Sequence, residues 1–158
     1  MIQATVCFLL KDDEILLAMK KRGFGVGKWN GSGGKMKAGE TPVSTTIREA
    51  KEEIGVDIEP NDLEKVAENE FNFLEHPDWD IFCHVYFVRN WQGEPSESEE
   101  MKPQWFKIKD IPYDKMWADD IYWLGRVLSG EKLRANFKFS GTGDVVAEHS
   151  VETVDSFV

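Results

Sequence analysis

The sequence predicts an α/β (α+β) fold in which a mixed β-sheet carries helices packed against it. The main observation is the order of the expected elements, which runs strands, helix, strands, helix, strands. The second is size, because 158 residues with 41% hydrophobic and 12% aromatic content are enough for a buried core. No repeat, interdomain linker or low-complexity segment interrupts the chain, so we expect a single domain over residues 1–158.

The N-terminal part is expected to hold two strands and a glycine-rich loop. Residues 2–10 alternate in a strand-like way, and residues 14–19 continue as a second strand after a turn at 11–13. Residues 20–35 are expected to be a loop, because glycine recurs throughout them. Such a loop can bring backbone N–H groups close to phosphate oxygens, although glycine alone is weak evidence.

A helix is expected to follow this loop. Thr41 suits the N-cap, Pro42 the first helical position and Gly55 the helix stop. Apolar residues between these signals recur at helical spacing and form one stripe, namely Val43, Ile47, Ala50 and Ile54.

The rest of the chain alternates between strands and one further helix. In order, we expect strands at 66–73 and 81–88, an acidic loop at 95–100, a strand at 104–108, a helix at 119–128 and one or two strands within 137–154. The strand at 81–88 is apolar on both faces, which predicts a central position in the sheet.

The first helix carries a cluster of carboxylates. Glu49, Glu52 and Glu53 are predicted to lie on the side of the helix opposite the apolar stripe, three and four residues apart. Their mutual repulsion would be relieved by a hard divalent cation, and Glu40 in the preceding loop can reach the same region. The competing interpretation is a solvated acidic face. Arg48 either pairs with Glu52 one turn on or holds the preceding loop.

The spacing of these residues favours the metal site. From Gly34 to Val56 the chain reads GKMKAGETPVSTTIREAKEEIGV, with a glycine, then Glu40, then Arg48-Glu49, then Glu52-Glu53 and Gly55. This segment resembles the signature box of the Nudix hydrolases. The resemblance implies an α/β/α sandwich that uses water and Mg²⁺ or Mn²⁺ to cleave a nucleoside diphosphate linked to another moiety.

Further blocks resemble the Nudix subfamily that hydrolyses oxidised purine nucleoside triphosphates such as 8-oxo-dGTP and 2-oxo-dATP. They occur in order along the chain, at 20–25, 28–31, 33–35, 99–103, 116–120 with 122–123, and 137–139. The implied activity releases a nucleoside monophosphate and diphosphate and clears damaged nucleotides from the pool. The alternative substrates are a dinucleoside polyphosphate or a nucleotide sugar, and a third interpretation is a non-catalytic nucleotide-binding protein.

The resemblance implies a role for each matching residue. The implied metal ligands are the Gly33 carbonyl, Glu49, Glu52, Glu53 and Glu100, and the general base is left open among Glu53, Glu49 and Glu100. The implied substrate-binding residues are Thr5, Lys20, Phe24, Asn30, Ser32, Gly33, Gly34, Lys35, Trp117, Ala118, Asp119 and Asp120. Within this set, Lys20 and Lys35 would lie near the phosphates, and Asn30, Trp117 and the two aspartates would contact the base.

Several of these residues have a simpler interpretation. Glu100 ends an acidic run that can be a solvated loop, Lys20 can be a surface lysine and Asn30 can make a turn. The aromatic residues can be core. Departures from the subfamily pattern are the small Ala50, Ser32 in place of a bulky residue and the segment 75–81, so the base preference is left open among oxidised guanine, oxidised adenine and alkylated guanine.

Asp119 and Asp120 offer the sharpest choice. They either cap the helix that follows or bind the base. Their surroundings are made apolar by Trp117, Tyr122 and Trp123. Ionising two adjacent carboxylates there is unfavourable, because burial and like charge both oppose it, so the pKa of one of them should rise. A neutral carboxyl can donate a hydrogen bond to an acceptor atom of a purine, while an ionised carboxylate accepts one from a purine N–H. We therefore expect one of the pair to be neutral when the base is bound.

The overall charge limits the partners. A net charge of −10 argues against a nucleic-acid polymer or an anionic membrane as partner, but a metal-neutralised nucleotide remains possible. The N-terminus lacks a signal-peptide pattern and no stretch reads as membrane-spanning. Two cysteines without a CxxC motif favour a reduced, cytoplasmic protein, and we expect a monomer. His76, His84 and His149 show no metal-ligand spacing.

Overall fold

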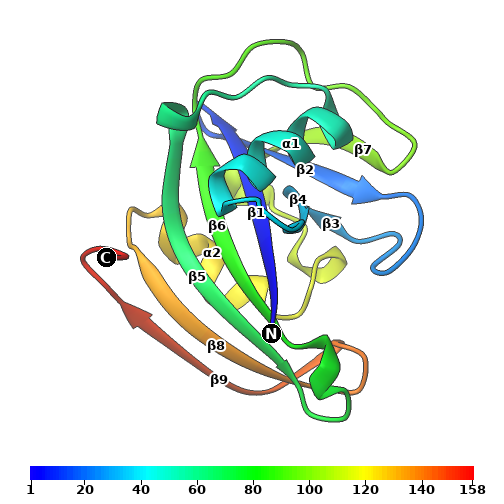
Figure 1. Ribbon diagram of the computed structural model, residues 1–158, viewed down its shortest axis with the longest axis vertical. Helices are drawn as coiled ribbons and strands as arrows, with labels where there is room; N and C mark the ends of the chain where they lie inside the picture. Colours follow the sequence, from blue (N-terminus) through cyan, green and yellow to red (C-terminus); the bar gives the residue numbers. More distant parts are fainter.

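A computed structural model describes residues 1–158, and its long first strand lies at the centre of a mixed sheet (Figure 1). The strands are β1 (Ile2–Lys11), β2 (Glu14–Lys20), β3 (Trp29–Asn30), β4 (Ser32–Lys35), β5 (Leu63–Phe73), β6 (Ile81–Val88), β7 (Met101–Lys107), β8 (Leu133–Ser140) and β9 (Val145–Thr153). Their order is β3-β2-β1-β6-β5-β8-β9, with β4 paired to β1 and β7 to β2. The β1–β6 and β5–β8 pairs are parallel, which makes the sheet mixed.

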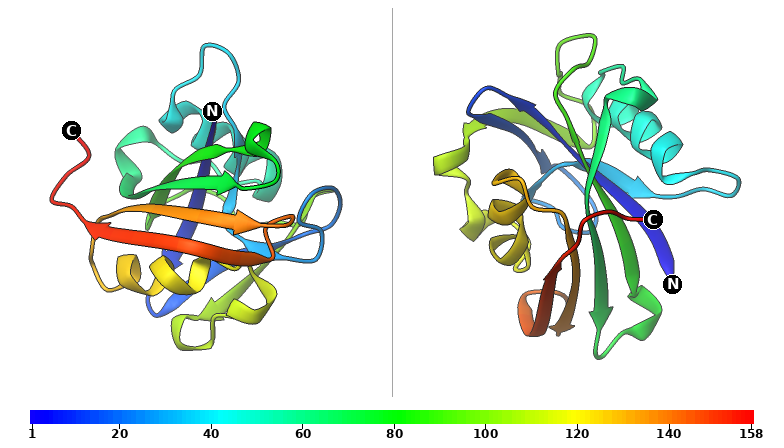
Figure 2. Two further views of the ribbon diagram at one scale, coloured as in Figure 1. Left: turned by 90° about the horizontal axis from the view of Figure 1, so that it is seen from below. Right: turned by 90° about the vertical axis from the view of Figure 1, so that its left-hand side faces the viewer.

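Two helices cover opposite faces of this sheet. They are α1 (Pro42–Ile54) and α2 (Asp120–Leu128), and the right-hand view of Figure 2 shows the sheet between them. Four single-turn 3₁₀ helices complete the chain, at Pro60–Asp62, Pro77–Trp79, Ile108–Asp110 and Tyr113–Lys115. The predicted mixed sheet with packed helices is confirmed. Neither helix is long and apolar enough to cross a bilayer.

The ends of α1 follow from its sequence signals. Thr41 is the N-cap, and its Oγ1 accepts from the Ser44 N–H while Ser44 Oγ accepts from the Thr41 N–H, at 3.1 and 2.9 Å. Pro42 occupies the first helical position, and Gly55 ends the helix in the left-handed conformation, with φ 74°. All three predicted signals are confirmed.

The prediction of a loop over residues 20–35 is wrong at its end. Trp29–Asn30 pairs with β2, and Ser32–Lys35 lies antiparallel to β1, with Gly33 opposite Val6 and Gly34 opposite Thr5. A Cβ on Gly33 would lie 1.9 Å from the Thr5 carbonyl oxygen, so only glycine allows this approach. These glycines therefore place a strand against β1.

Three other strands begin earlier than predicted, and the first of them is β5, which begins at Leu63 instead of residue 66. β7 begins at Met101 and includes Pro103, which is tolerated because this strand pairs only with β2. The C-terminal region forms two strands, and β8 starts at Leu133 because Leu133, Ala135, Phe137 and Phe139 alternate into the core.

The sheet separates two apolar cores. The larger lies on the α2 side and includes Phe8, Val85, Trp123, Leu124 and Phe137. The smaller lies under α1, where Ala50 and Ile54 are buried and Val43 and Ile47 pack against them. The predicted apolar stripe of α1 is thus confirmed.

Candidate active site

Glu53 is buried between α1 and β4. Its side chain is only 4% exposed, and its Oε1 accepts from the Gly33 N–H at 2.7 Å. This corrects the prediction that Glu53 shares the helix side opposite the apolar stripe, because it borders the stripe and faces the sheet. Burial raises the pKa of Glu53 to about 8, helped by the charges of Glu49 and Glu100 and opposed by the Gly33 N–H and Lys20.

Glu49 lies beside Glu53 against the backbone of β4. A Cβ on Gly34 would come within 2.7 Å of Glu49 Oε1, so this glycine leaves room for the carboxylate. Burial raises the pKa of Glu49, and the charges of Glu52 and Glu100 add to this while Arg48 opposes it. Glu52 is more than half exposed, on the outer side of the same helix.

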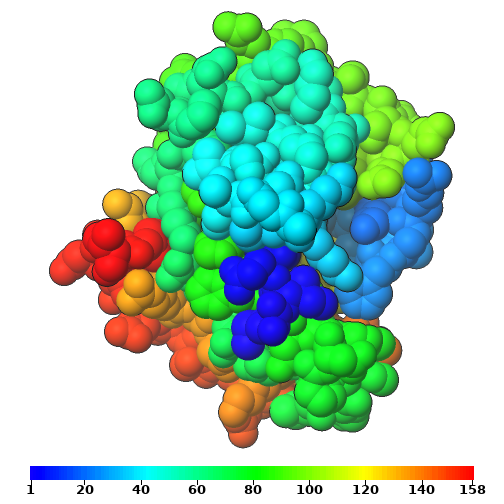
Figure 3. All heavy atoms as spheres, in the orientation of Figure 1, coloured from blue at the N-terminus to red at the C-terminus, as the bar shows by residue number.

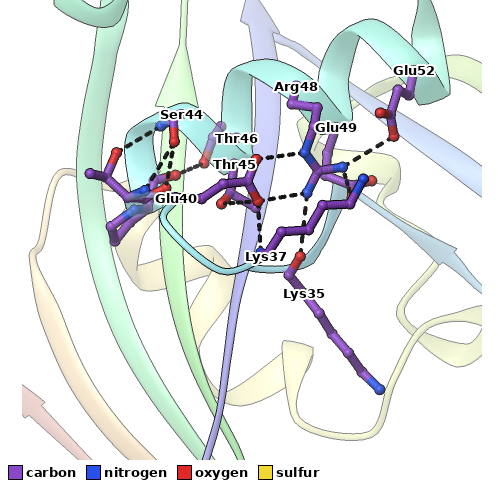
Figure 4. A network of polar contacts seen from close by, with 11 residues as sticks. Lys35, Lys37, Glu40, Ser44, Thr45, Thr46, Arg48, Glu49 and Glu52 are labelled. Carbon is purple, nitrogen blue, oxygen red and sulfur yellow. Dashed lines mark hydrogen bonds and ion pairs between the residues drawn. The ribbon is translucent and has the colours of Figure 1, made fainter.

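Arg48 fulfils both roles that its position allowed. Figure 4 shows its guanidinium among carboxylates from the helix and the preceding loop, at 2.7 Å from Glu40, 2.8 Å from Glu49 and 3.2 Å from Glu52. It also donates to the Lys35 carbonyl at 3.4 Å. The hydrogen bond from Arg48 lowers the pKa of Glu40 to about 2, with the Lys37 N–H helping. Glu40 therefore fixes the loop instead of joining Glu53.

Glu100 comes to the site from the loop before β7. In Figure 3 this loop lies beside residues 20–28, and the Lys21 N–H donates to the Glu100 carbonyl at 2.8 Å. The Glu100 carboxylate lies 3.6 Å from Arg22. Because Glu100 raises the pKa of both Glu49 and Glu53, it lies near enough to interact with them.

These carboxylates fit a divalent cation chemically, although they do not form a closed cage. No group of three His, Cys, Asp or Glu side chains converges enough to hold a metal, because Glu49 and Glu52 turn toward Arg48. Glu53, however, is a buried carboxylate whose only hydrogen bond comes from a backbone N–H. A divalent cation bound by oxygen ligands would offset the repulsion among Glu49, Glu53 and Glu100.

Asp119 and Asp120 form a second buried acidic group on the other side of the sheet. Each is 3% exposed, and Asp119 Oδ2 accepts from the Trp123 indole N–H at 2.8 Å. Asp119 makes no side-chain capping bond to α2, and Asp120 Oδ2 has no partner. Asp119 thus stands at the N-cap position of α2, but its side chain does not cap the helix. Burial raises the pKa of Asp119 to about 6, and burial plus the charge of Asp119 raises that of Asp120 well above its usual value.

Aromatic rings lie next to this acid pair. The ring centroids of Phe24 and Trp117 are 5.1 Å apart, and Phe24 lies 6.1 Å from Trp79, which contacts Phe73. Lys28 Nζ sits 5.1 Å from the Trp117 ring. Phe24 is mostly exposed on its loop, whereas Ala118 packs against the α2-side core. The structure thus brings Phe24 and Trp117 together, as predicted.

Ser32 lies apart from this aromatic group, and its substrate contact stays a prediction. It lies opposite Cys7 and is buried with Leu9 and Ile54 under α1. The reason is strand alternation, because Ser32 belongs to a paired strand and takes the face of Cys7. Thr5, two residues before Cys7, shares that face, and neither hydroxyl has a hydrogen-bond partner.

The positions of Asn30 and Lys35 do not distinguish a substrate contact from a turn-forming or surface role. Asn30 Oδ1 accepts from the Gly31 N–H at 2.8 Å, so its turn-forming role is present. The Lys35 side chain extends away from the Arg48 network in Figure 4 and is exposed. A surface hollow of about 410 Å³, lined by Lys11, Arg89, Asn90, Trp91, Gly93 and Glu94, contains none of the predicted site residues.

Comparison of the sequence with known protein families agrees with this arrangement of a glutamate-bearing helix on a mixed sheet. The profile of the NUDIX domain matches residues 1–127. This chain belongs to the Nudix family. It is 42% identical over 151 residues to a Danio rerio protein named oxidized purine nucleoside triphosphate hydrolase, covering 96% of this chain and 94% of that protein.

Other similarities agree with this assignment. A Mus musculus protein of the same name is 41% identical over 153 residues, covering 97% of this chain and 96% of that protein. The 8-oxo-dGTP diphosphatase of Escherichia coli is 33% identical over 82 residues, which are 52% of this chain and 60% of that protein. The structure of a MutT protein from Bacillus halodurans has the same fold, with a TM-score of 0.84 at 24% identity, covering 96% of this chain and 98% of that one.

Some residues near the acid pair of this Nudix hydrolase were not predicted. Phe73, Trp79 and Lys28 contact the aromatic group, and Asn69 is buried on the same face of β5 as Phe73. The period-two pattern of residues 66–73 contains the signal, since Asn69 falls among the inward positions. The sequence alone does not say that β5 lies between β6 and β8.

Proposed function

We propose that this Nudix enzyme hydrolyses oxidised purine nucleoside triphosphates to a nucleoside monophosphate and diphosphate, and so removes damaged nucleotides from the pool. The observation that carries the proposal is the buried pair Asp119 and Asp120 beside Phe24 and Trp117. Two carboxyls with raised pKa values and an adjacent ring suit a planar base with hydrogen-bonding edges. The names of the two full-length relatives agree with this substrate class.

The triphosphate end is proposed to lie at the box helix. Glu49, Glu52, Glu53 and Glu100 would hold Mg²⁺ or Mn²⁺, with the Gly33 carbonyl as a further ligand. The metal would supply charge neutralisation on phosphate oxygens and a lower pKa for the attacking water. Lys20 and Lys35 would contact phosphates. Glu53, Glu49 or Glu100 would take the proton of the water, and Gly33 holds Glu53 in place through Oε1.

The acid pair is proposed to bind the base of the substrate through hydrogen bonds, with one carboxyl neutral and the other ionised. Burial raises the pKa of Asp119 to about 6, and burial together with the charge of Asp119 raises that of Asp120 well above its usual value, so we assign Asp120 as the neutral carboxyl and Asp119 as the ionised one. Asp120 can then donate while Asp119 accepts from a purine N–H. Trp117 and Phe24 would stack on the base, and Asn30 would contact its edge.

This assignment predicts a pH-dependent affinity. Because the pKa of Asp119 in the folded protein is about 6, lowering the pH from 7 to 5 protonates it and removes the acceptor. The dissociation constant of 8-oxo-dGMP should rise about tenfold over this range, and Asp119→Asn should abolish the change. Titration calorimetry at several pH values measures both. A wild-type affinity that stays flat would exclude Asp119 as the titrating acceptor.

The same pKa shifts predict a stability effect of defined sign. Both aspartates have folded-state pKa values above the usual 3.8, so the folded protein binds protons more tightly than the unfolded chain. The contribution of Asp119 to stability is therefore lost as the pH rises from about 4 through 6, and that of Asp120 also falls as the pH rises. Asp119→Asn should weaken this loss, which thermal unfolding at pH 5 and 7 would reveal.

The substrate class is tested by a panel of nucleoside triphosphates. With Mg²⁺, kcat/KM should be higher for 8-oxo-dGTP and 2-oxo-dATP than for dGTP and dATP, with diphosphate release as the readout. O6-alkylated dGTP in the same panel decides the base preference that the sequence leaves open. Faster turnover of a dinucleoside polyphosphate or nucleotide sugar would establish the alternative Nudix substrate. Binding without diphosphate release would establish the non-catalytic interpretation.

The proposed setting is the cytoplasm, with the protein acting as a monomer. Cys7 and Cys83 are both free and buried, which suits a reducing compartment. The net charge of −10 agrees with a small nucleotide substrate and not with a nucleic-acid polymer.

A further inference from the structure

Asn69 on β5 is a buried carboxamide without a hydrogen-bond partner in the protein. It is 0% exposed, and neither its Oδ1 nor its Nδ2 meets a donor or an acceptor. A buried unpaired amide is unfavourable, because the hydrogen bonds that water makes to the unfolded chain are lost on folding. A ligand that supplies the missing partners would account for this residue.

The strands on either side of Asn69 place only short side chains next to its amide. Cys83 on β6 lies directly opposite, and Ala135 on β8 lies on the other side. Paired residues point to the same face of a sheet, so all three belong to the α2 side. Both neighbours are shorter than asparagine, and neither bridges the carboxamide.

The acid pair lies over this same part of the sheet. Asp119 is bonded to Trp123, which belongs to the core that contains Cys83 and Ala135. The charges of Asp119 and Asp120 also add to the effect of burial in raising the pKa of the Cys83 thiol, so they lie near the cross-strand neighbour of Asn69. Asp120 Oδ2 is itself unpaired, which leaves two buried polar groups without partners on one side of the sheet.

We propose that Asn69 is a base-recognition residue whose carboxamide donates to and accepts from the purine edge that the acid pair binds. The assignment rests on the proposed function. Because no protein group fixes the amide, rotation of its side chain exchanges donor and acceptor. A 6-oxopurine presents an acceptor beside a donor and a 6-aminopurine presents the reverse order, so one side chain serves both.

The test is Asn69→Leu, which keeps the approximate size and removes both hydrogen-bonding groups. We expect KM for 8-oxo-dGTP and for 2-oxo-dATP to rise about tenfold with little change in kcat. The melting temperature should not fall, because an unpaired polar group has been removed. The matched control is Asn136→Leu, whose amide is bonded to Glu70 and Asn72 on the opposite face and which should lower the melting temperature without changing KM.

A second measurement does not depend on how the variant folds. In wild-type protein, the side-chain ¹⁵N–¹H signals of Asn69 should shift when 8-oxo-dGMP is added. Unmoved Asn69 signals alongside shifted Trp117 signals, or an unchanged KM in a less stable Asn69→Leu, would overturn the assignment. Failure of the proposed function would appear as absent turnover of oxidised nucleotides by the wild type. The assignment of Asn69 is tested separately, because the NMR titration can be repeated with dGMP and dAMP.

Discussion

Replacing Glu53 with glutamine is expected to lower kcat about a hundredfold or more, the scale for losing one key electrostatic contact in an active site. Glutamine keeps the size of the side chain, and its Oε1 can still accept from the Gly33 N–H, so the local structure should be retained. What is lost is the negative charge that the buried carboxylate offers to a cation or to the proton of water. Single-turnover kinetics with Mg²⁺ and 8-oxo-dGTP would measure this step.

The matched control is Glu64→Gln, because Glu64 is an exposed glutamate on β5 that contacts only Arg89 at 3.6 Å. Its kcat should equal that of the wild type. Affinity for 8-oxo-dGMP should be similar in both variants, since the residues proposed to bind the base lie on the other side of the sheet. A kcat near the wild-type value for Glu53→Gln would remove Glu53 from the reaction.

Metal removal extends the same prediction to stability. Without metal, the pKa of Glu53 is about 8 in the folded protein against 4.5 ordinarily, so its ionisation is disfavoured by folding. Stability from this group is therefore lost as the pH rises from 4.5 through 8. In EDTA above pH 8, Glu53→Gln should melt at a higher temperature than the wild type, and Mg²⁺ should stabilise only the wild type appreciably.

The features that the sequence predicted are mostly local. The bounds of α1 follow from Thr41, Pro42 and Gly55, which act on their own neighbours, and the apolar stripe fixes the face that packs on the sheet. The helical wheel predicts the wrong side of α1 for Glu53, because Glu53 lies at the border of that stripe. Whether a border residue is buried depends on β4, which lies against it across the chain.

The features that were missed depend on strand pairing. The resemblance implies a substrate contact for Ser32, but a resemblance does not say to which face of a strand a side chain points. Once Ser32 pairs with Cys7, its face is decided by register. The surroundings of Asn69 likewise depend on the pairing of β5 with β6 and β8, which sets Cys83 and Ala135 beside it. Such long-range pairings leave no local signal at the residue itself.

Gly33→Ala is expected to produce the largest loss of stability, because the backbone of β4 lies against β1 at this residue. The added Cβ would be 1.9 Å from the Thr5 carbonyl oxygen and 2.8 Å from the Val6 Cα. Both are backbone atoms of the central strand and cannot rotate away. We expect a loss of at least about 3 kcal/mol in the free energy of unfolding, and a melting temperature lower by roughly 10 °C.

The same change should reduce activity in the fraction that remains folded, because the Gly33 N–H holds Glu53 Oε1 at 2.7 Å. Displacing β4 breaks this contact, so kcat should fall at least about tenfold, within the range for a mispositioned active-site group. The matched control is Gly125→Ala within α2, where a Cβ would meet only Tyr113 Oη at 3.8 Å. That variant should gain up to about 1 kcal/mol, since alanine is the better helix former. Urea unfolding of both proteins measures the difference in stability. If Gly33→Ala were as stable as Gly125→Ala, β4 could not lie this close to β1. The burial of Glu53, which depends on the position of β4, would then also be contradicted.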